Sequence, residues 1–464
     1  MNSLPGFILQ LLLVLLALLG MAGDNGPLTV LAVVVLGVGI HLLFRPRVSP
    51  ILLFIFGYQW LQASTKIFQG NFLGVPIDSL SMFGGDVAGA TFLSLISLLF
   101  LVFGLRLGAG PGAGDEPKLL RADASGKPLL YWFNLYLLAF LIALGMSFLS
   151  NLVPGMRIPF LALASLKWAF YWAFTFATFS QDSGPKRLWL LVFLLELIMG
   201  SVSYFSDFKT ILFFTLLAML PAGVRLSPVR VMGLLALAAL TLVLGVVWTA
   251  IKTDYRDFLS QGERAQVVSV SHEESFSSLL TLVGDLDGFS LKTAAMDMAE
   301  RVSYVDIFAR AVDYVPATKP YQYGAVWGDA IRRPFMPRLF FSEKTAIDDS
   351  NFTNEFTGLS FGNNDSGTSV SIGYIGESYI DFGAFFMMTP IFMLGLGLGI
   401  YYKWISSYPA VGGLLSSGLA TATLYPVAQL ETSITKLIGG LVISMLMAWI
   451  LAHWGLPYIR RFEK

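Results

Sequence analysis

Runs of about twenty apolar residues recur along the chain, and they limit its fold more than any other feature. A helix of about 20 residues crosses the roughly 30 Å hydrocarbon core of a bilayer. Only helices and closed barrels satisfy all their backbone polar groups there. The 464 residues are 55% hydrophobic and 13% charged, whereas soluble domains carry roughly 25% charged residues. We therefore predict an all-α polytopic membrane protein.

Twelve such runs are expected to form membrane spans. They cover residues 5–22, 27–44, 50–66, 87–107, 129–151, 157–180, 187–205, 208–223, 229–250, 374–402, 408–428 and 435–456. The first run is rich in leucine, but no Lys or Arg precedes it and the second run follows almost at once. Secretory signal peptides begin with a positively charged region, so we interpret the first run as an uncleaved span.

Lysine and arginine are distributed unevenly over the short loops between these spans. One alternate set of loops contains most of them, whereas the other has only Lys66, Arg157, Lys209 and Lys436, all near span ends. Cytoplasmic loops are enriched in Lys and Arg. The bias therefore predicts a multi-pass membrane protein with both termini in the cytoplasm. In a Gram-negative cell this membrane would be the bacterial inner membrane, with the outer side facing the periplasm.

Residues 251–373 form the one long polar segment, which this orientation places in the periplasm. The segment divides the chain into a bundle of nine spans (1–250), a loop domain (251–373) and a bundle of three spans (374–464). An amphipathic helix is expected at 291–315. The irregular region that follows (316–373) is long, and long irregular loops are usually functional or mobile.

Charge and rare residues exclude several classes of function. The net charge is zero, and the chain has no cysteine and three histidines. A nucleic-acid-binding protein would have a basic footprint, so we expect no nucleic acid partner. Without cysteine there is no disulfide and no thiolate metal site. We expect neither a metal nor a cofactor.

The stretch "AIRRPFMPRLFFSEK" (330–344) concentrates positive charge in a loop that has 11 Lys/Arg and 17 Asp/Glu. Its cations are Arg332, Arg333, Arg338 and Lys344. Arginine makes forked contacts with phosphate oxygens, so the stretch is a candidate pyrophosphate clamp bent by two prolines. The alternative is a folded loop whose arginines pair with nearby acids such as Glu343, Asp348 and Asp349.

The beginning of the tenth expected span, "GYIGESYIDFGAFF" (373–386), contains two acids. Glu377 and Asp381 are four residues apart and share a helical face, and Tyr374 lies nearby. A carboxylate at the outer end of a span is a candidate general base. The alternative is a solvated helix start, where the helix dipole favours acids.

Two further pairs of charges occur in or between spans. Lys167 and Glu196 are expected near mid-membrane on adjacent helices, either as a buried ion pair or with Lys167 lining a cavity for an anionic headgroup. Asp207 and Lys209 lie in the short turn "SYFSDFKT" (203–210) between two spans.

The chain resembles the Wzy-type polysaccharide polymerases, also called O-antigen or oligosaccharide repeat-unit polymerases. Twelve spans with one large late external loop carry the resemblance, together with three short matches. These are "MPRLFFSEKTAIDD" (336–349), "IGESYIDFG" (375–383) and "SYFSDFKTILFF" (203–214). The chain departs from the family pattern at Asp381, where Asn is commoner, and at Thr345, where Pro is frequent.

This resemblance implies a GT-C-like helical bundle and an enzyme that joins undecaprenyl-pyrophosphate-linked oligosaccharides at the periplasmic face. A hydroxyl of one glycan attacks the anomeric carbon of another, and undecaprenyl pyrophosphate leaves. Preorganised cations stabilise such a leaving group, and no metal is then required. A chain-length regulator is a further implied partner.

With this reaction in view, the site residues receive expected roles. For pyrophosphate binding they are Arg338, Arg332, Arg333, Lys344, Lys209 and Arg301. For proton transfer they are Glu377, then Asp365, then Asp207. For sugar or acceptor binding they are Tyr379, Tyr374 and Asp381.

Two alternatives remain at this level. One is a transporter or flippase of lipid-linked saccharide, because many transporters have twelve spans, although no internal repeat is evident here. The other is an O-antigen ligase-type enzyme, which uses the same donor with a different acceptor.

Overall fold

The computed structural model describes residues 20–21, 23–111, 116–181, 186–202, 208–223, 228–261, 270–336, 341, 343–362, 369–408, 411 and 413–457. Over these residues the fold is all-helical, without a strand. The predicted fold class is confirmed at that level.

The helices before the large loop come first. They are α2 (Gly26–Leu43), α3 (Ile51–Leu73), α4 (Val87–Ala109), α5 (Glu116–Gly126), α6 (Leu129–Leu152), α7 (Arg157–Ser165), α8 (Lys167–Ser180), α9 (Lys186–Val202), α10 (Phe208–Met219) and α11 (Pro228–Leu259). The loop contains α12 (His272–Gly284), α13 (Gly288–Val302), α14 (Asp306–Tyr314), α15 (Ala325–Arg332) and α16 (Asp349–Thr357). The last helices are α17 (Tyr374–Phe386), α18 (Met388–Ser406), α19 (Gly413–Leu424) and α20 (Ile434–Ile450).

Short turns of helix connect these elements. They are η1 (Ile77–Leu80), η2 (Pro154–Met156), η3 (Arg333–Phe335) and η5 (Tyr425–Ala428), and a π-helical turn, η6 (Leu451–Gly455), extends α20.

Several helices are suited to a membrane. Within the described residues, five helices are long and apolar enough to cross a bilayer, or six if the bent pair α17–α18 is counted as one span. Helices α10 and α19 have only 12 residues each, about 18 Å at 1.5 Å per residue. The first expected span, 5–22, falls almost entirely outside the described residues. The count of twelve therefore stays a prediction.

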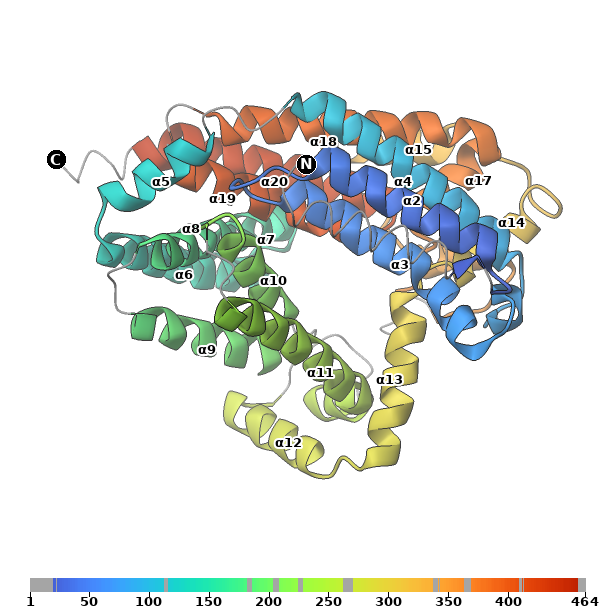
Figure 1. Cartoon of the computed structure of the whole chain (residues 1–464), viewed down its shortest axis with the longest axis horizontal. Helices are drawn as coiled ribbons and strands as arrows, with labels where there is room; N and C mark the ends of the chain where they lie inside the picture. Colours follow the sequence, from blue (N-terminus) through green and yellow to red (C-terminus); the bar gives the residue numbers. More distant parts are fainter. Residues whose placement is uncertain are drawn as a thin grey trace.

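Helices α4 and α18 form a close pair, which lies along the upper edge of Figure 1 beside α2. Each contributes two glycines spaced four residues apart, Gly104 and Gly108 on α4 and Gly395 and Gly399 on α18. A Cβ atom on Gly104 would lie 2.3 Å from the carbonyl oxygen of Phe392. Small residues at this spacing allow helix backbones in membranes to approach closely.

The expected continuous span at 374–402 is instead broken. Helices α17 and α18 meet at an angle of 117°. Gly383 has φ +73°, a left-handed conformation that glycine adopts readily. Pro390 lies in the first turn of α18, where its missing N–H costs nothing. A glycine followed by a proline thus permits the bend, and α17 turns away from the axis of α18.

The amphipathic helix expected at 291–315 is two helices. Helix α13 ends at Val302 and α14 begins at Asp306. In Figure 1, α13 extends away from the main bundle, whereas α14 lies at the end of it against α4. The break is fixed by Lys66 of α3, which is fully buried and pairs with both Asp306 and Glu300. One lysine thus attaches both helices to the bundle.

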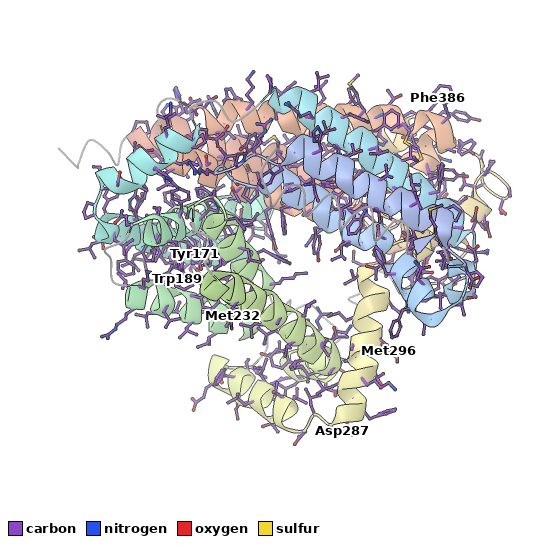
Figure 2. The ribbon with its side chains drawn as sticks, viewed as in Figure 1. Tyr171, Trp189, Met232, Asp287, Met296 and Phe386 are labelled. Atoms are coloured by element: carbon purple, nitrogen blue, oxygen red, sulfur yellow. The ribbon has the colours of Figure 1, made fainter. Side chains whose placement is uncertain are left out.

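The pair predicted between Lys167 and Glu196 is confirmed as an ion pair. The Lys167 Nζ atom lies 2.8 Å from both carboxylate oxygens of Glu196. The Tyr136 hydroxyl donates to the same carboxylate at 2.6 Å. Glu196 is buried. Figure 2 labels Tyr171 of α8 and Trp189 of α9, which lie on the same two helices as Lys167 and Glu196.

Candidate functional site

A cavity of about 420 Å³ lies where α15, α16, α17 and the beginning of α20 meet. It brings together two of the expected site residues, Arg333 and Glu377, which are 44 positions apart and come from different elements. Helices α15 and α16 belong to the loop, whereas α17 and α20 belong to the C-terminal bundle. The site therefore forms only when the loop folds onto the bundle.

Glu377 is a buried carboxylate in the wall of this cavity, with 3% of its surface exposed. Its Oε2 atom accepts a hydrogen bond from the backbone N–H of Ile434 at 2.8 Å. That N–H belongs to the first turn of α20, where the helix dipole favours negative charge. The Oε1 atom is held more loosely, by the Ser371 hydroxyl at 3.4 Å.

Ser371 is itself fixed by a neighbour from outside the membrane helices. The Tyr304 hydroxyl, which lies between α13 and α14, donates to the backbone carbonyl of Ser371. Burial raises the pKa of the Tyr304 phenol well above its usual range, so this group stays a hydrogen-bond donor.

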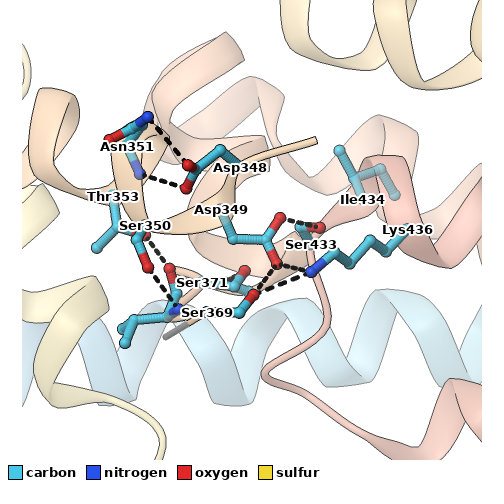
Figure 3. A network of polar contacts seen from close by, with 12 residues as sticks. Asp348, Asp349, Ser350, Asn351, Thr353, Ser369, Ser371, Ser433, Ile434 and Lys436 are labelled. Carbon is cyan, nitrogen blue, oxygen red and sulfur yellow. Dashed lines mark hydrogen bonds and ion pairs between the residues drawn. The ribbon is translucent and has the colours of Figure 1, made fainter. Parts of the chain in front are cut away.

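A second buried acid, Asp349, joins α16 to the beginning of α20 (Figure 3). Its carboxylate lies 2.6 Å from Lys436 Nζ and accepts a hydrogen bond from the Ser433 hydroxyl at 3.0 Å. Ser369 also donates to it, at 3.3 Å. Sequence reasoning noted Asp349 only as a partner for the arginines, and it missed Ser433 and Lys436. Their polar cluster directly before an apolar run was the available signal.

The cations of the 330–344 stretch divide between the cavity and its surroundings. Arg333 lines the cavity and pairs with Asp329, one turn earlier on α15. Arg332 is 72% exposed, with Asp329 at 3.6 Å. Lys344 donates to the backbone carbonyls of Arg333 at 2.7 Å and Met336 at 3.0 Å, so it ties the loop together. Part of the charge is thus paired, as in the alternative considered from sequence, but the partner is Asp329.

Asp381, expected to bind sugar, is instead fully buried and caps α15. Its carboxylate accepts backbone hydrogen bonds from Gly324 at 2.9 Å, Val326 at 3.2 Å and Trp327 at 2.9 Å. An acidic cap satisfies the unpaired N–H groups of a helix start. Asp381 therefore positions the helix that lines the cavity.

The two tyrosines expected to stack on sugar are also packed in the interior. Tyr374 is fully buried, and its hydroxyl donates to the Gln59 side chain at 2.7 Å. Tyr379 is 5% exposed, and its hydroxyl donates to the backbone carbonyl of Val315 at 2.8 Å. Both join α17 to its neighbours, and neither lines the cavity.

The other expected site residues do not line the cavity or lie outside the described residues. Lys209 is in the first turn of α10, which belongs to the group of helices around α8 and α9. Asp365, Asp207 and Arg338 lie outside the described residues, and so does the side chain of Arg301.

The described lining of the cavity is rich in carboxylates. It has one guanidinium, Arg333, and five acids, which are Asp329, Asp348, Asp349, Glu355 and Glu377. Carboxylates accept hydrogen bonds from hydroxyl groups but repel phosphate. The cavity is thus better suited to the hydroxyls of a saccharide than to an anion. No group of three side chains suited to hold a metal occurs among the described residues.

Comparison with known proteins assigns the chain to a family. No curated protein and no solved structure matches the chain. A family described as Domain of unknown function (DUF8712) matches residues 130–410. The match runs from the second residue of α6 through α18, and it contains three of the four helices around the cavity. Since that match covers more than half of the 464 residues, the protein belongs to the DUF8712 family.

Proposed function

We propose that the protein is an integral-membrane glycosyltransferase that elongates lipid-linked saccharides, as its resemblance to the Wzy-type polymerases implies. The observation that carries the proposal is the cavity where α15, α16, α17 and the beginning of α20 meet. It joins a buried carboxylate, Glu377, to an acid-rich wall suited to sugar hydroxyls, beside helices long and apolar enough for a bilayer.

In this proposal Glu377 is the general base. The hydroxyl oxygen of the acceptor sugar attacks the anomeric carbon of the donor and forms the new glycosidic bond. The bond from that carbon to the pyrophosphate oxygen breaks, and the lipid pyrophosphate leaves with the electron pair. The hydroxyl proton passes to the Oε1 atom of Glu377, the oxygen that is more loosely held.

Cations of the 330–344 stretch would bind the leaving pyrophosphate at the edge of the cavity. Arg333 is in the described wall, and its charge is partly balanced by Asp329. Arg338 remains the preferred further ligand, with Lys344 and Arg332 beside it in the sequence. The acid-rich floor would then hold the acceptor saccharide, so that donor and acceptor charges are separated.

The finer topology belongs to the same proposal. We infer twelve spans in the bacterial inner membrane, both termini in the cytoplasm and the cavity at the periplasmic face. The observed bias of Lys and Arg between alternate loops supports this orientation. A chain-length regulator is a proposed partner.

A carboxylate-to-amide substitution tests the base. We expect Glu377→Gln to lower the rate of elongation by about 10²–10⁴-fold, the usual contribution of general acid–base catalysis, while binding of the lipid-linked donor is retained. Glu343→Gln is the matched control, because Glu343 is exposed and does not line the cavity. Rates are measured with purified protein in detergent.

Equal rates for wild type and Glu377→Gln would show that Glu377 is not the general base.

A transporter of lipid-linked saccharide is the second candidate, because a discontinuous helix pair beside a cavity is also typical of transporters. A transporter would move the lipid-linked units across a bilayer but leave their length unchanged.

A further inference from the structure

A second, apolar groove of about 510 Å³ lies next to the acidic cavity, at the bend between α17 and α18. One wall is formed by Trp327 and Ile331 of α15, and the other by residues on both sides of the bend, including Phe386 and Met393. No charged side chain lines it in the described part of the chain. Figure 2 labels Phe386 at the end of the molecule, far from Asp287 and Met296 at α13.

The acidic cavity and the apolar groove share α15 as their common wall. Val326 and Asp329 of this helix line the cavity, whereas Trp327 and Ile331 line the groove. With eight residues, α15 is about 12 Å long. The two spaces are therefore a short distance apart around one helix, and one amphiphilic molecule can reach both.

The groove is also held in shape before any ligand binds. The indole N–H of Trp327 donates to the Ser378 hydroxyl at 3.0 Å. Asp381 caps the same helix through three backbone hydrogen bonds. Both contacts attach α15 to α17, so the walls of the groove are fixed by buried polar contacts. A preorganised apolar site loses little entropy when it binds a hydrocarbon chain.

The position of the groove favours a hydrocarbon chain that enters from the bilayer. Met393 lies on α18, the half of the bent pair that is long and apolar. Phe386, which lines the groove, is 64% exposed, and Phe335 at the end of η3 is 72% exposed. Such exposed aromatic side chains are costly in water and favourable in the apolar part of a membrane.

We propose that this groove binds the isoprenoid tail of the lipid-linked substrate whose saccharide occupies the acidic cavity. The inference rests on the proposed function, because it assumes that the substrate is a lipid-linked saccharide. The groove would fix the distance between the membrane-embedded tail and the reacting sugar. It is assigned to the substrate's own tail, because a bulk phospholipid carries no saccharide to fill the cavity on the other side of α15.

Photo-crosslinking of the full-length protein in nanodiscs tests this site. The probe is farnesyl pyrophosphate with a benzophenone on its terminal isoprene unit, and labelled peptides are identified by mass spectrometry. We expect label on α15 and at the beginning of α18. Phe386→Ala should reduce this labelling about tenfold, the order expected when a partly buried aromatic contact is lost.

Phe385→Ala is the matched control, because Phe385 is adjacent, 82% exposed and not part of the groove. It should change labelling less than twofold. Unchanged labelling in Phe386→Ala would overturn the assignment of the groove to the isoprenoid tail. So would equal labelling of the same peptides by a benzophenone phosphatidylethanolamine, which would identify an ordinary lipid contact. Specific labelling in a protein that does not elongate saccharides would uphold the groove and reject the proposed function.

Discussion

Glu377 and Asp381 show how two identical charges four residues apart acquire different roles. Their spacing on one helix predicts a shared face, but the structure places Glu377 in the wall of the cavity and Asp381 in contact with the beginning of α15. The difference arises from the elements that pack against α17. Glu377 meets α20, whereas Asp381 meets the loop.

The role of Asp381 as a cap leads to a prediction about stability. We expect Asp381→Asn to lower the free energy of unfolding by about 1.5–3 kcal/mol, the value for a hydrogen bond to a charged group. An amide presents an NH₂ group where one carboxylate oxygen accepted an N–H, so at least one backbone donor of α15 loses its partner. The midpoint of thermal unfolding in detergent measures the effect.

Asp313→Asn serves as the control, because Asp313 is an exposed carboxylate on α14. Its midpoint should match that of the wild type. If Asp381→Asn were as stable as the wild type, Asp381 would not hold α15, and its expected contact with sugar would be open again.

At the scale of elements, the contact between α4 and α18 should be sensitive to single methyl groups. A Cβ atom on Gly399 would lie 2.5 Å from the carbonyl oxygen of Leu105, whereas one on Gly397 would meet nothing within 4 Å. We expect Gly399→Ala to destabilise the protein by about 1–3 kcal/mol through overpacking. Gly397→Ala should be neutral or stabilise it by up to about 1 kcal/mol, because alanine favours helix.

Thermal unfolding of the two variants in the same detergent makes the comparison. Equal midpoints would contradict the close approach of α4 and α18. The direction of the difference is informative because both substitutions add one methyl group to the same helix.

Hydropathy and spacing predicted most helices and the Lys167–Glu196 pair, but not the breaks. The pattern of 291–315 fits one amphipathic helix, and the division into α13 and α14 depends on Lys66, more than 200 residues earlier. The bend after α17 had local signals in Gly383 and Pro390, but their consequence depends on where α15 packs. Such contacts between distant segments leave no periodic trace in the sequence.

The candidate site was predictable only in part, because it too depends on contacts between distant segments. Glu377 and Arg333 were identified by residue type and local context, and both line the cavity. The sequence did not predict the buried positions of Tyr374, Tyr379 and Asp381. An aromatic or acidic residue at a helix start has the same sequence context whether it faces a ligand or the interior. The contribution of α20 was missed because Ser433 and Lys436 come near Glu377 only in the folded protein.

For the whole molecule, the fold places an acidic cavity and an apolar groove on opposite sides of one short helix, at the end of a helical bundle. Figure 1 places α14, α15 and α17 together at that end, far from α9 and α12. A site for an amphiphilic substrate is thus concentrated in one region of the molecule. No described residue of α11, α12 or α13 lines either space.

Elongation by the purified wild-type protein in detergent is the most direct measurement of the proposed activity. Lipid-linked repeat units are supplied without an ion gradient or a second compartment, and product lengths are determined by mass spectrometry. We expect saccharides that grow by whole repeat units, with one lipid pyrophosphate released for each bond formed. Repeat units that stay at their original length, although the same preparation moves them across the bilayer of a proteoliposome, would contradict the polymerase and identify a transporter.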